Sequence, residues 1–350
     1  MRQMLIIRII LFCFTTVAMA RSRMYDACIV GAGPAGIAAA VSLAQQQLRV
    51  AVLDRGNGAL DNGTWLTRMP IPDEMRAPDK LKPFMLKSFD GYDNVNHFIG
   101  EVFNIVRTKP GRHGHFVVEA EGRRVRARRI LLAPGYEIMY PNIPGYKDAW
   151  MKVLFNDPLS DGSKGNLGAY SSAVLATDAS GSVLATMHLA RMALHYTDRV
   201  TIYTNHNLKL SDDISRHLLY EVTTELQKKV RVDNRRISKL HAIEVRSRKS
   251  SKGYAQSHKI VIFFADGKDS KHSFMFHLPT GKLNLDFVQD LHIRLTDGGL
   301  IKVDPSSMET TEKGIYAAGD CVSFKRTIIR SMFTGQLAAE SIAISRLFDY

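Results

Sequence analysis

A glycine-rich segment near the start of the chain has the residue types and spacing of a phosphate-binding turn. It follows the short apolar run of residues 25–30 and opens residues 35–45, whose Ala and Leu content is typical of a helix. The first glycine permits a tight turn, the second lets the backbone approach a pyrophosphate, and the third allows close helix–sheet packing. The helix N-terminus adds unpaired N–H groups and a positive dipole end. We therefore expect a dinucleotide to bind at Gly31, Ala32, Gly33, Pro34, Ala35 and Gly36.

An acidic residue follows this motif at the spacing expected of a ribose-binding position. Residues 49–53 form a second apolar run, and Asp54 ends it 18 residues after Gly36. An acidic side chain there accepts hydrogen bonds from ribose hydroxyls. Strand, glycine turn, helix and strand together form one mononucleotide-binding half of a doubly wound sheet. We expect Asp54 and its neighbour Arg55 to line the cofactor site.

Two later segments favour FAD over NAD as the dinucleotide. Residues 131–135, Leu-Leu-Ala-Pro-Gly, resemble the A-T-G strand end of flavoproteins with two dinucleotide sites, although Pro134 replaces the usual Thr. Residues 314–320 resemble the second FAD signature of those proteins. The resemblance implies that an aspartate bonds the ribityl chain and that the following helix, residues 327–347, points its N-terminus at the pyrimidine side of the flavin. The further FAD contacts expected on this basis are Ala133, Gly135, Gly319, Asp320, Thr327 and Ile328.

From about residue 24 to its end, the chain resembles the thioredoxin-reductase-like flavoproteins, which are class-II pyridine nucleotide-disulfide oxidoreductases. The most similar branch is the fungal one that contains dithiol oxidases of secondary-metabolite pathways. That closer resemblance rests on residues 188–194, His-Leu-Ala-Arg-Met-Ala-Leu, followed by residues 199–204, Arg-Val-Thr-Ile-Tyr-Thr. It implies FAD as cofactor, a small-molecule substrate and a homodimer.

The redox cysteine pair of that family is missing from this chain. In the family, C-x-x-C-[DH]-G follows an Ile-Pro-Gly segment, here residues 143–145, which places Asp157 and Ser160 where the two cysteines would stand. A dithiol relay needs one thiolate to attack and a second thiol to resolve, so thioredoxin reduction and ordinary dithiol oxidation are excluded. Asp161 matches an acid/base residue of the family, and a plain Asx turn is the alternative. The candidate catalytic residues are Asp161, Asp157 and Ser160, and the three cysteines are Cys13, Cys28 and Cys321.

A second nucleotide motif is damaged. Residues 176–182, Ala-Thr-Asp-Ala-Ser-Gly-Ser, lack the first two glycines, and Asp178 would put negative charge near incoming phosphates. After the next strand, residues 203–207 supply no arginine for a 2′-phosphate. NAD(P)H binding is therefore disfavoured without being excluded, and this region is either a weakened NAD(P)H site or a scaffold beside the substrate.

The elements that must position these residues form an α/β fold with two Rossmann-like dinucleotide-binding domains, of the three-layer ββα/βα type, in which the FAD domain is discontinuous. Three successive strands over residues 100–108, 115–121 and 124–132 predict an antiparallel insertion in the first domain. A helix is expected over residues 212–230 and a strand over residues 260–264. The expected divisions are a signal peptide at 1–20, the first FAD-binding segment at 24–150, a degenerate NAD(P)-binding-like domain at 151–285 and the second FAD-binding segment at 286–350.

Charge and the N-terminus suggest a secreted protein rather than a nucleic-acid binder. The net charge is +13, but the arginines of residues 123–129 alternate with apolar residues, as on the solvated face of a strand. Aromatic residues, which would indicate nucleic-acid binding, do not alternate with these arginines.

Residues 1–20 have the basic, apolar and small-residue regions of a secretory signal, although an uncleaved anchor or a wrong start codon is the alternative. The glycosylation sequon at residues 62–64 fits a secretory route. No stable membrane span is expected after cleavage of the signal. The sequence has three cysteines without metal-ligand spacing, so no metal site is predicted.

These residues leave three hypotheses for function. The leading one is an FAD-dependent oxidoreductase that oxidises a small molecule in fungal secondary-metabolite biosynthesis and passes the electrons to O2 or another acceptor. The second is an NAD(P)H-dependent flavin reductase that acts directly on its substrate. The third is a non-catalytic flavin-binding protein.

Overall fold

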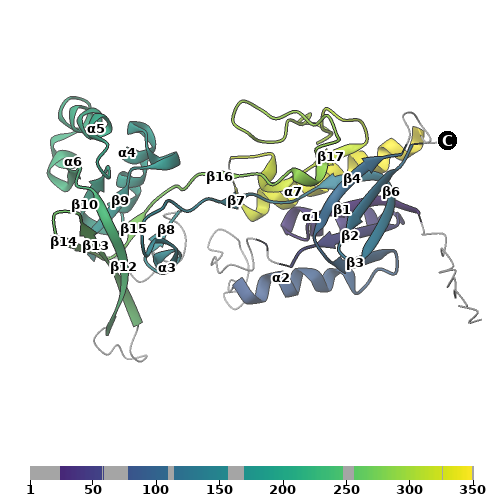
Figure 1. Ribbon diagram of the computed structural model, residues 1–350, viewed down its shortest axis with the longest axis horizontal. Coiled ribbons are helices and arrows are strands. Elements are labelled where there is room, and N and C mark those ends of the chain that lie inside the picture. The colour runs from purple at the N-terminus through teal and green to yellow at the C-terminus, as the bar shows by residue number, and fades with distance from the viewer. Residues whose placement is uncertain are drawn as a thin grey trace, which may run out of the picture.

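Two mainly parallel sheets organise the computed structural model, which describes residues 24–56, 58, 78–108, 114–156, 169–246, 256–324 and 326–348. Within these ranges, the first sheet has seven strands in the order β3-β2-β1-β6-β5-β4, with β17 also paired to β6. The second has five strands in the order β11-β10-β9-β15-β8. Figure 1 shows the sheets in two lobes joined by a thin ribbon. The expected α/β class is confirmed, whereas the signal segment and the sequon lie outside the described residues.

The core of the first sheet consists of strands that are buried on both faces. Ala27, Cys28 and Ile29 are fully buried, as the near-continuous apolar sequence of a parallel strand predicts. Helix α1 packs closely on helix α7, because a Cβ on Gly335 would lie only 2.1 Å from the Ala35 carbonyl oxygen. The elements of this lobe outside its antiparallel strands are β1 (Met24–Val30), α1 (Pro34–Gln45), β2 (Val50–Asp54), α2 (Pro78–Leu86), η3 (Lys87–Phe89), β3 (Val95–Ile99), η6 (Asp286–Val288), β17 (Ile315–Ala317), η7 (Gly319–Cys321), α7 (Ile328–Ser345) and η8 (Arg346–Phe348).

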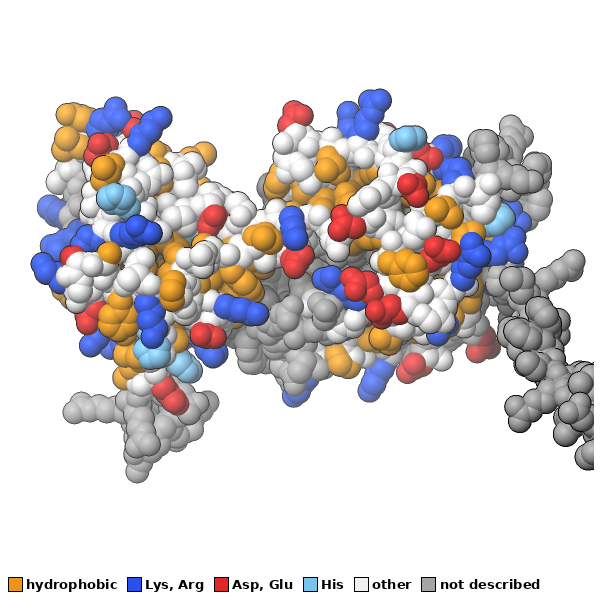
Figure 2. Space-filling view, viewed as in Figure 1, with side chains coloured by type: hydrophobic (Ala, Val, Ile, Leu, Met, Phe, Trp, Pro, Cys, Tyr) orange, Lys and Arg blue, Asp and Glu red, His pale blue; other side chains and the backbone are white. Residues whose placement is uncertain are grey.

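The three predicted antiparallel strands are present, but they are not a separate insertion. They are β4 (Val102–Arg107), β5 (Phe116–Ala120) and β6 (Arg123–Leu132). The first half of β6 pairs with β5, whereas its second half pairs with β17 and its length runs parallel to β1. Arg123 and Arg124 are exposed while Val125 and Ala127 are buried, which confirms the solvated basic face. In Figure 2, basic side chains are spread over both lobes of the face drawn.

The second lobe repeats the strand–turn–helix–strand pattern and adds an antiparallel layer. The predicted helix over residues 212–230 is in fact two helices, because residues 221–223 interrupt it. The strand over residues 237–246 was not predicted. The parallel sheet and its helices contain β8 (Leu154–Phe155), β9 (Ala169–Leu175), η5 (Asp178–Ser180), α4 (Val183–Ala193), β10 (Thr197–Tyr203), α5 (Leu208–Tyr220), α6 (Thr224–Lys229), β11 (Val230–Asp233) and β15 (Met275–Phe276). The antiparallel layer contains β12 (Ile237–Arg246), β13 (Gln256–Phe264) and β14 (Asp269–His272).

A two-stranded ribbon links the lobes. It pairs β7 (Glu137–Ile138) with β16 (Gly281–Lys282) in antiparallel register, and the short helix α3 (Tyr146–Ala149) follows β7. Figure 1 shows this ribbon between the two sheets. Among the described residues, no helix is long and apolar enough to cross a membrane.

A buried histidine in the second lobe predicts a loss of stability in acid. Burial lowers the pKa of His272 to about 4, and its ring lies 2.7 Å from the Tyr203 hydroxyl and 3.1 Å from the Ser171 hydroxyl. Between pH 6.5 and about 4 the unfolded chain binds a proton that the folded chain refuses, so the free energy of unfolding falls as the pH falls, by roughly 1.4 kcal/mol per pH unit. Urea unfolding across this window measures the slope. His272→Gln should flatten it, whereas the exposed His188→Gln should not, and equal slopes in both variants would contradict the assignment.

Candidate functional site

The three segments expected to bind FAD meet at one edge of the first sheet. Parallel register places Val30, Leu132 and Ala317 side by side at the carboxyl ends of β1, β6 and β17. The pairing continues past the strands, since Ala133 N–H donates to Val30 O (2.8 Å) and Ala318 N–H donates to Leu132 O (2.9 Å). Ligands of open α/β sheets bind beyond the carboxyl ends of the strands. The topology therefore brings all three motifs to one binding edge.

Close approach of neighbouring backbone explains why Gly31 and Gly36 are glycines, but it does not explain Gly33. A Cβ on Gly31 would lie 2.2 Å from the Ala133 carbonyl oxygen, and one on Gly36 would lie 1.9 Å from the Gly31 carbonyl oxygen. A Cβ on Gly33 would meet no atom of the described residues within 4 Å. This glycine leaves open space beside the backbone, as a pyrophosphate requires. The residues of the first motif therefore fit the phosphates of FAD.

The start of α1 is also open. Gly33 is its N-cap and makes no side-chain capping hydrogen bond, and Pro34, which has no N–H, occupies the first turn. The first N–H groups of a helix have no partner within it, and the dipole there favours an anion. Because the N-cap residue supplies no capping oxygen, an anionic ligand can accept these hydrogen bonds.

Asp54 belongs to a buried polar cluster that the sequence did not reveal. One carboxylate oxygen accepts from Ala32 N–H (3.4 Å), and the other lies 3.1 Å from Lys82 Nζ, with both side chains more than nine-tenths buried. The cationic Lys82 offsets the negative charge of Asp54 beside the phosphate-binding turn. Burial lowers the pKa of His97, and its Nε2 is buried without a hydrogen-bond partner among the described residues. This orphaned atom fits a polar group of the bound cofactor, while Arg55 is exposed next to the cluster.

The third motif holds Asp320 at the foot of α7. Ser331 Oγ donates to Asp320 Oδ1 (3.1 Å), and burial raises the pKa of this carboxyl group. Gly319 N–H donates to Thr334 Oγ1 (3.0 Å). Thr327 is the N-cap of α7, where its hydroxyl accepts from Arg330 N–H (3.2 Å). Ile328 begins the helix, and Gly135, at φ +76°, turns the chain after the second motif.

Sequence reasoning missed two residues: Arg326, whose charge acts on this carboxylate, and Tyr136, which Arg326 contacts. The guanidinium of Arg326 stands 3.4 Å above the ring of Tyr136, and its charge acts to lower the pKa of Asp320. The Tyr136 hydroxyl donates to the Gly281 carbonyl oxygen (2.6 Å), which ties the ribbon to the second motif. Both residues sit next to recognised motifs, and that adjacency is the one signal that could have found them.

The two cysteines of the described chain are both buried and free. Burial raises the pKa of Cys28 and of Cys321 to about 12. Because the thiolate is the reactive form, a thiol with a raised pKa is a poor nucleophile. The expected catalytic positions Asp157, Ser160 and Asp161 lie outside the described residues.

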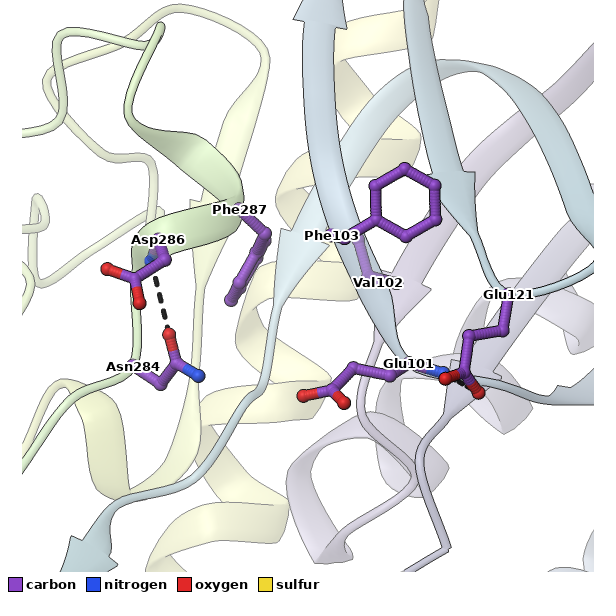
Figure 3. A pocket seen from close by; sticks show the side chains of 7 residues that line it. All are labelled: Glu101, Val102, Phe103, Glu121, Asn284, Asp286 and Phe287. Carbon is purple, nitrogen blue, oxygen red and sulfur yellow. Dashed lines mark hydrogen bonds between the residues drawn. The ribbon is translucent and has the colours of Figure 1, made fainter.

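A hollow of about 200 Å³ lies between the start of β4 and η6 (Figure 3). Its lining residue Glu101 follows Gly100, whose N–H donates to the Asp54 carbonyl oxygen (2.9 Å). Three carboxylates on its lining disfavour phosphate there, so the phosphates of a dinucleotide belong at α1 instead. The lining residues are Glu101, Val102, Phe103, Glu121, Asn284, Asp286 and Phe287.

Comparison with known families identifies the chain. Residues 25–341 match the model of the pyridine nucleotide-disulphide oxidoreductases. The chain belongs to this family. Its members are flavin-dependent oxidoreductases, which confirms the expected enzyme class, and the family implies FAD together with NAD(P)H.

Fungal proteins and solved structures share the similarity. Thioredoxin reductase sirT of Leptosphaeria maculans is 26% identical over 331 residues, which cover 91% of this chain and 93% of the relative. Thioredoxin reductase tcpT of Claviceps purpurea is 27% identical over 336 residues, which cover 95% of this chain and 97% of the relative. The crystal structure of HlmI, at 23% identity and 93% coverage of both chains, has a TM-score of 0.76 and supports the fold. The expected fungal thioredoxin-reductase-like resemblance is confirmed.

The contrast among the glycines predicts that FAD binding and folding can be separated. Gly33→Ala adds a methyl group where the protein has room, so stability should change by less than about 1 kcal/mol, whereas FAD affinity should fall at least about tenfold because the methyl group displaces the pyrophosphate. Gly36→Ala should lose both stability and FAD, because its Cβ strikes the backbone. Flavin absorbance after dialysis and thermal unfolding measure the two effects, with the exposed Gly91→Ala as control. Full FAD retention in Gly33→Ala would refute the placement of the phosphates.

Proposed function

We propose that this chain binds FAD and uses it to oxidise a small molecule without a redox-active cysteine pair. The observation that carries the proposal is the convergence of three motif ends on one sheet edge, with Gly33 and the start of α1 left open. Similarity to fungal thioredoxin reductases supports a role in secondary metabolism.

When bound, FAD would supply the redox chemistry, namely transfer of an electron pair from the substrate to O2 or another acceptor. The residues of the chain bind and orient. Gly33 and the first turn of α1 would hold the pyrophosphate, and Asp54 would accept from the ribose. Asp320 would hold the ribityl chain, and the N-terminus of α7 would stabilise negative charge on the reduced ring. The candidates for the proton acceptor are Asp157, Ser160 and Asp161.

The cysteines decide how the electrons leave the flavin. A family enzyme that reduces thioredoxin passes electrons through paired thiols, and this chain contains only Cys13, Cys28 and Cys321, far apart in sequence. The substrate must therefore approach the flavin directly. Family membership favours the alternative in which NAD(P)H is the electron donor, and a homodimer is proposed on the same ground.

Reductive titration tests the missing cysteine pair. Under anaerobic conditions, full bleaching of the flavin should take about one equivalent of dithionite per FAD, because the protein has no disulfide to reduce as well. Admission of air should restore the absorbance and release H2O2 in an amount close to that of FAD. Consumption of about two equivalents would reveal a hidden redox pair and overturn the proposal. Exposed thiols, counted with a thiol reagent before and after titration, provide the control.

A further inference from the structure

The loop between β9 and α4 has the place of a phosphate cradle in the second lobe. It leaves the carboxyl end of a parallel strand and enters a helix, as residues 31–36 do in the first lobe. A phosphate cradle works by presenting unpaired backbone N–H groups to the anion. The two loops can therefore be compared group by group.

Three consecutive backbone N–H groups of the second loop already have hydrogen-bond partners. Ala179 N–H donates to the Leu278 carbonyl oxygen (3.1 Å), beyond the end of β15. Ser180 N–H donates to Thr177 O (3.0 Å), and Gly181 N–H donates to Asp178 O (3.0 Å). To bind a phosphate, the loop would first have to break these hydrogen bonds.

The start of α4 is capped, unlike that of α1. Ser182 is its N-cap, and the hydroxyl oxygen accepts from Ala185 N–H (3.3 Å). At the equivalent position of α1, Gly33 has no side chain and leaves open space. The serine oxygen satisfies a donor that a phosphate would otherwise take.

A buried histidine fastens this loop to the segment after β15. His277 is fully buried, and its Nε2 lies 3.2 Å from Asp178 Oδ2 and 3.0 Å from Thr177 Oγ1. Its Nδ1 lies 2.6 Å from the Tyr146 hydroxyl. Both ring nitrogens therefore have partners, and the imidazole connects the loop to the Tyr146 side chain.

Asp178 adds electrostatic exclusion to this closure. Its hydrogen bond with His277 holds the pKa of the carboxyl group below its ordinary value, so the carboxylate is charged at neutral pH. The side chain is 27% exposed at the mouth of the loop. A negative charge there repels the pyrophosphate of a dinucleotide. The residue also holds φ +52°, a conformation that glycine adopts more readily.

The segment that directly follows β10 supplies no acid or arginine on the ribose side of the second lobe. Dinucleotide sites carry an acid for the ribose or an arginine for a 2′-phosphate after the second strand, and residues 204–207 contain neither. Asn205 Oδ1 accepts from Ile237 N–H (2.8 Å), and Asn207 Oδ1 caps α5 by accepting from Leu210 N–H (3.1 Å). These side-chain oxygens already serve the fold.

We propose that Asp178 and His277 are specificity determinants that close the second cradle against NAD(P)H, so that the flavin takes its electrons from the small molecule alone. The residues of the second lobe do not fit a pyridine dinucleotide, although the family implies one. The inference rests on the proposed function only for FAD occupancy, which the flavin absorbance of each sample reports separately.

Calorimetric titration of the FAD-loaded full chain with NADPH and with NADH tests the closure. The wild-type protein should show no saturable binding of either nucleotide up to millimolar concentration, and no bleaching of the flavin without air. A micromolar Kd for either nucleotide in the wild type would overturn the proposal. A purified protein that shows no flavin absorbance before any nucleotide is added would instead indicate failure of the proposed function.

Variants identify the residues responsible. Asp178→Gly removes the charge and relieves the positive φ, and it should tighten NADPH binding at least about tenfold relative to the wild type. His277→Asn, which releases the loop, should act in the same direction. Asp198→Asn removes a charge from the exposed start of β10 and should change nothing. If both loop variants retain FAD and fold yet bind NADPH no better than Asp198→Asn, the closure does not depend on Asp178 and His277 and the proposal fails.

Discussion

The parallel register of β1, β6 and β17 is the constraint on which the candidate site depends. Pairing of Val30 with Leu132 and of Leu132 with Ala317 places three distant segments at one edge. The register is held by backbone hydrogen bonds within a fully buried apolar core, where an unpaired N–H or C=O would be costly. Because β6 runs parallel to β1 and β17 and also pairs with the antiparallel strand β5, the antiparallel strands also support the site.

The two lobes show how one topology can support opposite chemistry. Each has a parallel strand followed by a tight loop and a helix, so the backbone presents similar edges. In the first lobe, Gly33 leaves the helix start uncapped, and the nearby carboxylate of Asp54 is paired with Lys82. In the second lobe, Ser182 caps the helix, and the loop itself contains the partly exposed carboxylate of Asp178. On the two proposals made above, a few side chains at the loop, and not the fold, would set the affinity for an anion.

Features encoded locally could be predicted from the sequence. The glycine turn, Asp54 and Asp320 could be proposed because each lies at a fixed spacing from a strand, and α7 begins at Ile328 with Thr327 as its N-cap, one residue later than expected. Contacts across long sequence separations could not be found in this way. Lys82 reaches Asp54 from a segment without a motif, and His277 meets Tyr146 across 131 positions. The lost glycines of the second motif indicated weak binding, but not that the segment after β15 fastens the loop.

The same reasoning applies to the path of electrons. A flavoprotein of this family can exchange electrons through a thiol pair or through a pyridine nucleotide, and each route needs its own local chemistry. Cys28 and Cys321 are buried thiols whose pKa values are raised to about 12, so neither supplies a thiolate at neutral pH. In the loop between β9 and α4, three consecutive backbone N–H groups already donate to backbone carbonyl oxygens. On the proposed function, the substrate would then have to meet the flavin directly, and Arg326, which lies over the ring of Tyr136 and acts on the charge of Asp320, is the nearest cation that the sequence did not reveal.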